Sequence, residues 1–185
     1  MACDSLRAFL EKLESEGQLV RFPKEVRPEP DIRAAASAAA SMSAGPALLF
    51  EKVRGYGKKQ IAMNVHGSFE NHALMLDLPK ETGPRAQFQE LVERWDRFPI
   101  LPKRVSNAPL KEVIIDKNPS LYRELPLFRV NPMDGGFYLS KACVISRDPE
   151  TGEDQNLGMY RMQVKDHDRI GIRAAEILKR RKSSA

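Results

Sequence analysis

The chain has 185 residues, of which 42% are hydrophobic and 30% charged, with Lys+Arg 30 against Asp+Glu 25 and a net charge of +5. This composition predicts a soluble globular protein and excludes disorder throughout, and the length excludes a large multidomain enzyme. No apolar run reaches the roughly 18 to 20 residues of a membrane span, and acidic residues near the N-terminus argue against a leader, so we expect a cytoplasmic protein with no membrane partner. Only Cys3 and Cys143 occur, and both are expected as reduced thiols.

The positive charge is concentrated near the C-terminus. Seven basic and three acidic residues lie between Lys165 and Ala185, whereas the rest of the chain is nearly neutral. A tail ending in KRRKSSA is typical of a solvated chain end. Because it lacks the aromatic side chains that accompany single-strand recognition, we expect no nucleic-acid partner.

The first predicted element is an amphipathic helix. Its apolar residues recur at helical spacing: Leu6, Phe9, Leu10 and Leu13. Asp4 can cap its start, and Gly17 follows its end, where a left-handed residue is common. Residues 18–22 then alternate as in a short strand, which Pro23 is expected to end.

Helices and strands continue to alternate over the first hundred residues. Asp31 is expected to cap an Ala-rich helix that ends near Ser43, and residues 47–53 and 60–65 predict two adjacent strands joined by a glycine-containing turn. Ser68 is expected to cap a third helix. A fourth helix is predicted from the spacing of four apolar residues: Phe88, Leu91, Val92 and Trp95. This alternation indicates an α/β or α+β layer domain.

Frequent prolines place a domain boundary between residues 99 and 109. Strand patterns at residues 112–115, 141–147 and 157–165 predict a mostly β second domain, and the last two flank the turn-rich segment RDPETGEDQN, as in a β-hairpin. We therefore expect an α+β protein with three parts: an N-terminal domain (1–105), a second domain (106–172) and a basic tail (173–185).

Few residues form a recognisable catalytic motif. The histidines lack a metal-binding spacing and are interpreted as structural or solvated: His66, His72 and His167. No G-x-S-x-G, Walker loop or G-x-G-x-x-G occurs. Three arginines are interpreted as ordinary surface charges: Arg33, Arg54 and Arg123.

The segment after residue 155 is different in kind. A strand there would place Arg161 on the same face as Leu157 and Met159. An arginine on an apolar face either extends to the edge of the sheet or is held by an acidic partner or a bound anion. Asn156 can offer its carbonyl oxygen to a hard cation, and Gly158 lets another backbone or a ring come close. The pattern leaves both interpretations open, an edge Asn with a surface Arg or a ligand site.

The string NLGMYRMQV, preceded by FRVNPMDGGFYLSKACVISRD and the RDPETGEDQN turn, resembles the prenylated-FMN-binding signature of the UbiD-type decarboxylases. These are the 3-polyprenyl-4-hydroxybenzoate decarboxylase family and related hydroxyaryl-acid decarboxylases. The segments ALLFEKVRGYG, NVHGSFENHALMLDLP and WDRFPILPKRV resemble that family's N-terminal domain. The resemblance runs from Leu6 to about Ile172 and implies an α/β layer domain followed by part of a split β-barrel flavin-binding domain.

The resemblance also implies site residues. Asn156 would bind the divalent metal, Mn²⁺ with or without K⁺, that grips the cofactor phosphate. Met159, Tyr160 and Arg161 would line the prenylated FMN. Arg161 would also be the catalytic arginine of the family's Glu-Arg-Glu network, which orients the substrate carboxylate.

The reaction that the resemblance implies is reversible, non-oxidative decarboxylation of a (hydroxy)aryl or α,β-unsaturated acid. The prenylated flavin would act as the electron sink, and a carboxylic acid would return the proton. The small-molecule partner is an aromatic carboxylic acid, and complete members of the family are expected to be homo-oligomers.

The sequence departs from the family where it turns into IRAAEILKRRKSSA. No histidine follows His167, and the two network glutamates are not matched. Two hypotheses follow. One is a UbiD-type carboxy-lyase portion with little or no turnover as an isolated chain, and the other is a non-catalytic interaction module or subunit that needs a complementary C-terminal chain.

Overall fold

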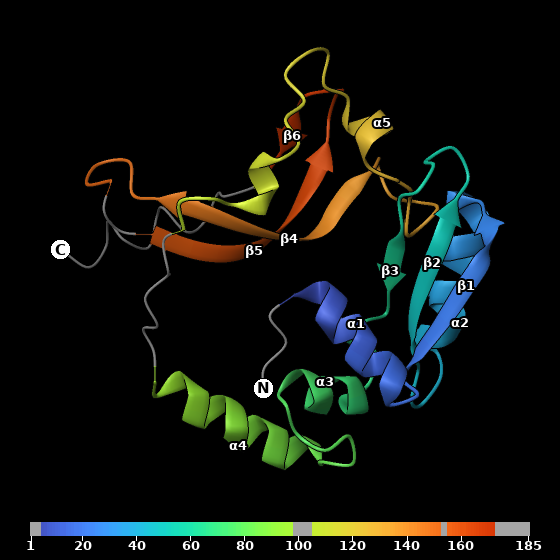
Figure 1. The fold of residues 1–185 in the computed structure, drawn as a ribbon, viewed down its shortest axis with the longest axis vertical. Helices are drawn as coiled ribbons and strands as arrows, with labels where there is room; N and C mark the ends of the chain where they lie inside the picture. Colours follow the sequence, from blue (N-terminus) through green and yellow to red (C-terminus); the bar gives the residue numbers. More distant parts are fainter. Residues whose placement is uncertain (1–4, 98–104, 153–154, 173–185) are drawn as a thin grey trace. The chain divides into compact units, whose positions relative to one another are not determined.

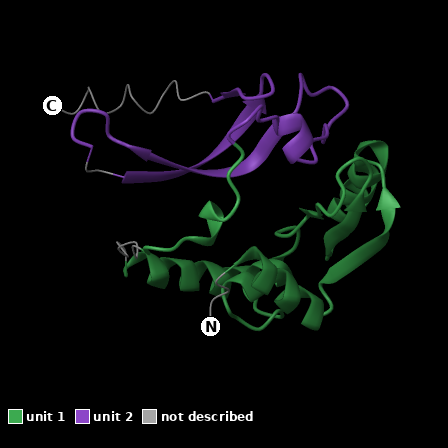
Figure 2. Cartoon of the chain, turned by 45° about the horizontal axis from the view of Figure 1, so that its top comes forward, with its two compact units in different colours: residues 1–115 green, residues 116–185 purple. Residues whose placement is uncertain are grey.

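A computed structural model describes residues 5–97, 105–152 and 155–172, which form two compact units divided between Ile115 and Asp116 (Figure 1; Figure 2). Within these ranges no helix is both long and apolar enough to cross a lipid bilayer. The predicted basic tail, residues 173–185, lies outside the described residues. The three-part division of the chain near residues 105 and 172 stays a prediction.

Unit 1 combines helices with a three-stranded sheet of order β1-β2-β3. In chain order its elements are α1 (Leu6–Ser15), β1 (Leu19–Val26), the π-helical turn η1 (Pro28–Ile32), α2 (Arg33–Ala40), β2 (Ala47–Val53), β3 (Ile61–Met63), α3 (Phe69–Met75), α4 (Pro84–Trp95) and the 3₁₀ turn η2 (Pro109–Lys111). β1 and β2 are parallel, and β2 and β3 are antiparallel, as expected for the two adjacent strands predicted there. Because a parallel pair needs cover on both faces, β2 is an apolar run whose first four residues are all buried.

The core of unit 1 lies where α1 and α3 meet β2. Three of the four apolar residues that predicted α1 pack there against β2 and α3, whereas Leu6 is exposed. The cluster consists of Phe9, Leu10, Leu13, Ala47, Leu49 and Leu74. α1 is capped by Ser5, whose Oγ accepts from the backbone N–H of Ala8 at 3.2 Å, and Asp4 lies outside the described residues. Gly17 adopts a φ of +72° just after the helix, as predicted.

The prediction that Pro23 ends the first strand was wrong. β1 continues to Val26, and its pairing with β2 shifts register between Phe22 and Glu25. A proline has no N–H to donate, and a bulge at an edge strand is a position where none is needed. The strand therefore passes through the proline instead of stopping.

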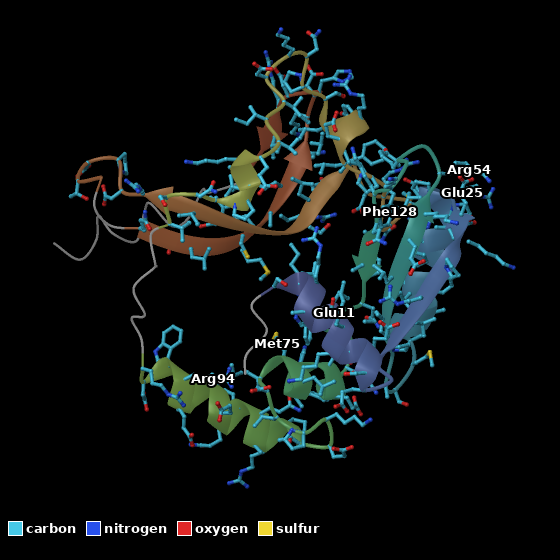
Figure 3. All side chains as sticks on the ribbon, viewed as in Figure 1. Glu11, Glu25, Arg54, Met75, Arg94 and Phe128 are labelled. Atoms are coloured by element: carbon cyan, nitrogen blue, oxygen red, sulfur yellow. The ribbon has the colours of Figure 1, made fainter. Side chains whose placement is uncertain are left out.

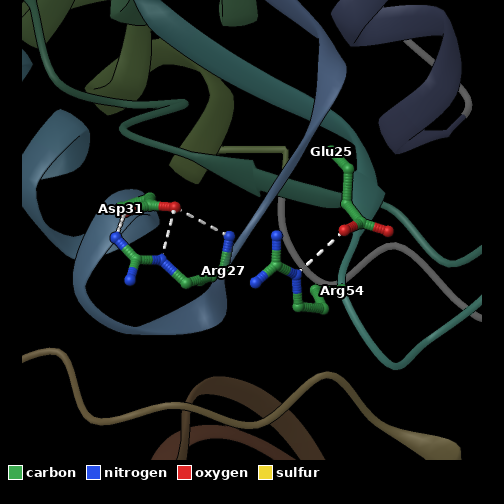
Figure 4. Close-up of polar contacts among 4 residues, drawn as sticks. All are labelled: Glu25, Arg27, Asp31 and Arg54. Atoms are coloured by element: carbon green, nitrogen blue, oxygen red, sulfur yellow. Dashed lines mark hydrogen bonds and ion pairs between the residues drawn. The ribbon is translucent and has the colours of Figure 1, made fainter.

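The prediction that Asp31 caps α2 was also wrong. Its carboxylate turns back to Arg27, accepting from the backbone N–H at 2.9 Å and from the guanidinium at 3.1 and 2.9 Å (Figure 4). α2 starts directly from η1 without a side-chain cap and ends at Ala40. Figure 4 also shows Arg54 paired with Glu25 at 2.9 Å, a surface ion pair that matches the interpretation of Arg54.

α4 is held by polar contacts instead of its apolar stripe. The buried Gln87 donates to the carbonyl oxygens of Phe69 and Thr82 at 2.9 and 2.6 Å. Arg94 donates to the carbonyl of Leu76, just past the end of α3; Figure 3 labels Arg94 on α4 and Met75 on α3. The four apolar residues that predicted the helix, Phe88, Leu91, Val92 and Trp95, are exposed.

The described residues of unit 2 form an open antiparallel sheet of order β4-β5-β6 and one short helix. Its elements are α5 (Leu121–Glu124), β4 (Tyr138–Arg147), β5 (Gln155–Val164) and β6 (Ile170–Gly171). The predicted β4–β5 hairpin is confirmed, and the open sheet agrees with part of a barrel. The strand predicted at residues 112–115 was wrong, because this segment follows η2 as irregular chain with exposed side chains.

The core position of Leu13 generates a stability prediction. Leu13 is 0% exposed, whereas Leu6 on the same helix is 57% exposed. Leu13→Ala should lower the free energy of unfolding by about 2 to 5 kcal/mol, since it leaves a cavity in a packed cluster. Leu6→Ala, the matched control, should change it by no more than about 0.5 kcal/mol. Urea unfolding followed by circular dichroism measures both, and equal effects would contradict the packing described here.

Candidate functional site

The β4–β5 hairpin has one face open to solvent. Cys143 pairs with Met159, and Ile145 pairs with Leu157. Of these four residues, which we call the open face, Ile145, Leu157 and Met159 are 69%, 68% and 62% exposed. Because side chains alternate along a strand, Arg161 leaves β5 on this same face, as predicted. The open face is therefore an apolar surface that ends at a guanidinium.

Arg161 is held on two sides. Its Nη2 donates to Oδ1 of Asp134 at 2.7 Å, and its Cζ lies 3.9 Å from the centre of the Tyr138 ring. The hydrogen bond from Arg161 holds the pKa of the Asp134 carboxyl below its ordinary value, and the backbone N–H of Asn131 acts in the same direction. Of the two outcomes predicted for an arginine on an apolar face, the structure has the acidic partner.

The loop that carries Asp134 is folded by its own hydrogen bonds. Asp134 accepts from the backbone N–H of Asn131 at 3.0 Å, and its own N–H donates to the Asn131 carbonyl at 3.0 Å. The Asn131 side chain accepts from the N–H of Met133 at 3.0 Å. Gln163 donates to the carbonyl of Gly135 at 3.1 Å, which ties the loop to β5 a second time. We call residues 131–136 the Asp134 loop.

The opposite face of β5 carries Asn156, Gly158 and Tyr160. A Cβ atom at Gly158 would lie 2.2 Å from Cε2 of Tyr160, so the ring of Tyr160 covers the glycine. Gly158 was predicted to let a ring come close, and in the structure that ring belongs to Tyr160 on the same strand. Asn156 is exposed and pairs with Ser146 on β4.

The predicted site residues are therefore divided between two faces. Met159 and Arg161 share the open face, whereas Asn156 and Tyr160 share the other. Asn156 and Arg161 are five residues apart, about 17 Å along a strand, so they could contact only the two ends of an elongated ligand. Asp134 and Tyr138 were missed, although an acidic partner for Arg161 was one of the predicted outcomes.

A metal ion is not held by the described residues themselves. In the described ranges no group of three or more His, Cys, Asp or Glu residues could hold a metal ion. The single carboxamide oxygen of Asn156 falls short of the six or more oxygen ligands that hard cations take. These residues do not fit a complete Mn²⁺ site. The open face instead offers apolar side chains and a guanidinium, groups that in general contact aromatic rings and anions.

The histidines have structural contacts. The ring of His66 stacks on Phe9 at 5.7 Å and lies 6.0 Å from the ring of His72, a proximity that their sequence spacing did not reveal. In unit 2, Nδ1 of His167 lies 2.8 Å from Oγ of Ser120, and its ring makes an edge contact with Tyr122. These contacts agree with the structural interpretation.

Comparison with known families identifies the chain. The N-terminal domain of 3-octaprenyl-4-hydroxybenzoate carboxy-lyase matches residues 10–95, and the Rift-related domain of the same enzyme family matches residues 103–183. The protein belongs to the UbiD family, as the sequence resemblance predicted.

The curated relatives are longer proteins. The phenolic acid decarboxylase of Sedimentibacter hydroxybenzoicus is 55% identical over 175 residues, which cover 91% of this chain and 36% of the relative. The phenolic acid decarboxylase of Bacillus subtilis is 51% identical over 176 residues, which cover 93% and 37%. The chain thus spans a little over a third of the length of these relatives.

Solved structures share the fold. The vanillic acid decarboxylase of Sedimentibacter hydroxybenzoicus in its open form has a TM-score of 0.88 and 49% identity, covering 99% of this chain and 40% of that chain. An evolved dimeric form of the UbiD-class enzyme HmfF from Pelotomaculum thermopropionicum, in complex with prFMN, has a TM-score of 0.79 and 33% identity, covering 93% and 38%. These matches confirm the predicted α+β fold.

The contact between Gly158 and Tyr160 is testable. Gly158→Ala should displace the Tyr160 ring, but it should change the free energy of unfolding by no more than about 1 kcal/mol, because the atoms that the new Cβ meets are at the far end of a partly exposed side chain. Gly135→Ala is the control, because a Cβ there would meet nothing within 4 Å. The measurements are urea unfolding and the NMR shifts of the Tyr160 ring protons. Ring shifts that stay unchanged in Gly158→Ala would show that the ring does not cover the glycine.

Proposed function

We propose that this chain is the part of a UbiD-type carboxy-lyase that presents the substrate-orienting arginine to prenylated FMN and a hydroxyaryl carboxylic acid. The observation that carries the proposal is the guanidinium of Arg161, which is 53% exposed at the end of an apolar strand face while Asp134 and Tyr138 hold it. The prFMN complex of the UbiD-class relative and the phenolic and vanillic acid decarboxylases among the matches support it.

The proposed reaction replaces a carbon–carboxylate bond with a carbon–hydrogen bond at the same ring carbon. The bond between the ring carbon and the carboxylate breaks, CO₂ leaves, and a proton takes its place on the same carbon. Prenylated FMN, when bound, supplies the electron sink that this carbon needs, which no protein side chain offers. The reaction consumes neither oxidant nor reductant, so its direction depends on the concentrations of the acid, the decarboxylated product and CO₂.

The chain's own residues have two proposed roles. Arg161 binds the substrate carboxylate through N–H groups that Asp134 does not use, because a guanidinium has five such donors. The side chain of Met159 lies on the same face and is proposed to line the flavin. Tyr160, which was predicted for the same role, leaves β5 on the other face and covers Gly158 there. Asn156 is proposed as one oxygen ligand of Mn²⁺ near the cofactor phosphate, with the other ligands coming from outside the described residues.

The second candidate is an interaction module that associates with a complementary C-terminal chain of the same family. Its specific observation is the open face, where three large apolar side chains are more than half exposed on one side of an open sheet. Contiguous exposed apolar side chains favour association. In both candidates we propose that the isolated chain has little or no turnover.

Cofactor retention tests the first candidate. The chain co-expressed with a prenylated-FMN synthase should retain the cofactor in native mass spectrometry. Arg161→Ala should weaken the Kd for FMN in a fluorescence titration by about 10- to 100-fold, since a hydrogen bond to a charged group contributes about 1.5 to 3 kcal/mol. Arg147→Ala, on the same hairpin, is the control and should leave the Kd unchanged.

Two results would contradict the first candidate. One is no cofactor retained by the wild-type chain, and the other is an equal loss of affinity in the two arginine variants. A separate assay of CO₂ release from hydroxybenzoates should stay near background for the isolated chain. Robust release would overturn the proposed lack of turnover.

Association tests the second candidate. The chain should co-elute in size-exclusion chromatography with the remaining portion of the Sedimentibacter relative, and Leu157→Asp should abolish the complex because it places a charge in the apolar face. Ile114→Asp is the control, since Ile114 is 77% exposed but lies in unit 1. Absence of a wild-type complex, or its loss in the control as well, would count against this candidate. A downstream reading frame that encodes the missing histidine and glutamates would support it.

A further inference from the structure

The side chain of Asp134 is less exposed to solvent than the acidic side chains of ordinary surface ion pairs. Exposed ion pairs contribute little, because solvent screens them and both side chains lose freedom. Arg54 and Glu25, for comparison, have side chains that are 63% and 55% exposed. The side chain of Asp134 is only 17% exposed, although its partner Arg161 is 53% exposed. The acid is thus fixed in the protein, and the cation reaches into solvent.

The Asp134 loop is anchored beyond its own hydrogen bonds. At its C-terminal end, the carbonyl of Phe137 accepts from the backbone N–H of the buried Val164 at 2.9 Å. The Phe137 ring makes an edge contact with Tyr122, which makes one with His167. Asp134 is therefore carried by a loop with little freedom to move away from β5.

Two directions of motion of the Arg161 guanidinium are restrained. The Asp134 carboxylate fixes one edge through Nη2, and the Tyr138 ring lies against one face. Among the described residues, Nε and Nη1 of Arg161 have no hydrogen-bond acceptor, so these donors remain for an anion.

We propose that Asp134 and Tyr138 are positioning residues, which fix the Arg161 guanidinium so that its remaining N–H groups are pre-oriented for the carboxylate of an aromatic acid or for a carbonyl oxygen of the flavin ring. The inference rests on the proposed function of Arg161 and adds two residues from outside β5. Asp134 acts through its carboxylate, and Tyr138 acts through its ring. The hydroxyl of Tyr138 has no part in the effect.

The direct test is the mobility of the Arg161 side chain in the full chain without cofactor. Heteronuclear NOE measurements on arginine Nε–Hε groups report restraint on the ps–ns timescale, and the Arg161 signal is identified by its loss in Arg161→Lys. Wild-type Arg161 should give a strong NOE, which should fall in Asp134→Asn and in Tyr138→Leu. Tyr138→Phe keeps the ring and should keep the NOE.

The matched control for charge is Asp116→Asn, which makes the same change at an exposed residue in unit 2 and should leave the Arg161 signal unchanged. Asp134→Glu, which restores the carboxylate, should recover most of the NOE. Far-UV circular dichroism of each variant verifies folding. If Asp134→Asn does not fold, the comparison of Tyr138→Leu with Tyr138→Phe still tests whether the ring restrains Arg161. An unchanged NOE in Asp134→Asn or Tyr138→Leu would overturn the assignment of that residue.

A second readout links the restraint to binding. In an FMN titration, Asp134→Asn should raise the Kd by about 3- to 10-fold, corresponding to the loss of about 0.7 to 1.4 kcal/mol, and Asp134→Glu should restore it. A lower Kd in Asp134→Asn would mean that Asp134 only competes with the ligand for Arg161, which would overturn the inference. If the wild-type chain binds no FMN, the proposed function fails, but the NOE result still decides whether Asp134 and Tyr138 hold the arginine.

Discussion

The alternation of side chains along β5 is the constraint on which the candidate site depends. Leu157, Met159 and Arg161 are two residues apart, so a regular strand places all three on one face. The cross-strand partners on β4, Cys143 and Ile145, extend the same face. A shift of one residue in register would send Arg161 to the face of Gly158 and away from Asp134. The register of the hairpin therefore decides whether an apolar surface and a guanidinium occur together.

Unit 1 obeys a different constraint. Its parallel β1–β2 pair must be covered on both faces, and β2 is correspondingly apolar along its first four residues. α1 and α3 contribute the core residues on the face of Ala47 and Leu49. α4 is attached through Gln87 and Arg94 while its apolar residues stay exposed, which parallels the open face of unit 2. Both units thus present apolar side chains that their own described residues do not cover.

Membership of the UbiD family gives these exposed surfaces a context. The chain spans a little over a third of the length of its curated relatives, so most residues of those relatives have no counterpart in the matched region. The residues it does contain include Arg161 and its two supports.

The sequence by itself determined the structural features that depend on residues close together in the chain. The spacing of Leu6, Phe9, Leu10 and Leu13 predicted α1, the Asp148–Gly152 turn predicted the β4–β5 hairpin, and strand alternation predicted which residues accompany Arg161. Family membership was also predicted from the sequence, because the matching segments extend over most of the chain.

Only the tertiary structure decided the contacts between distant residues. Asp134 and Arg161 are 27 positions apart, and their contact depends on the folded loop that carries Asp134. The passage of β1 through Pro23 depends on its pairing with β2. Such contacts close long loops, and the entropy lost on closing them is offset only when the whole sheet has formed. No local pattern of residues therefore predicts these contacts.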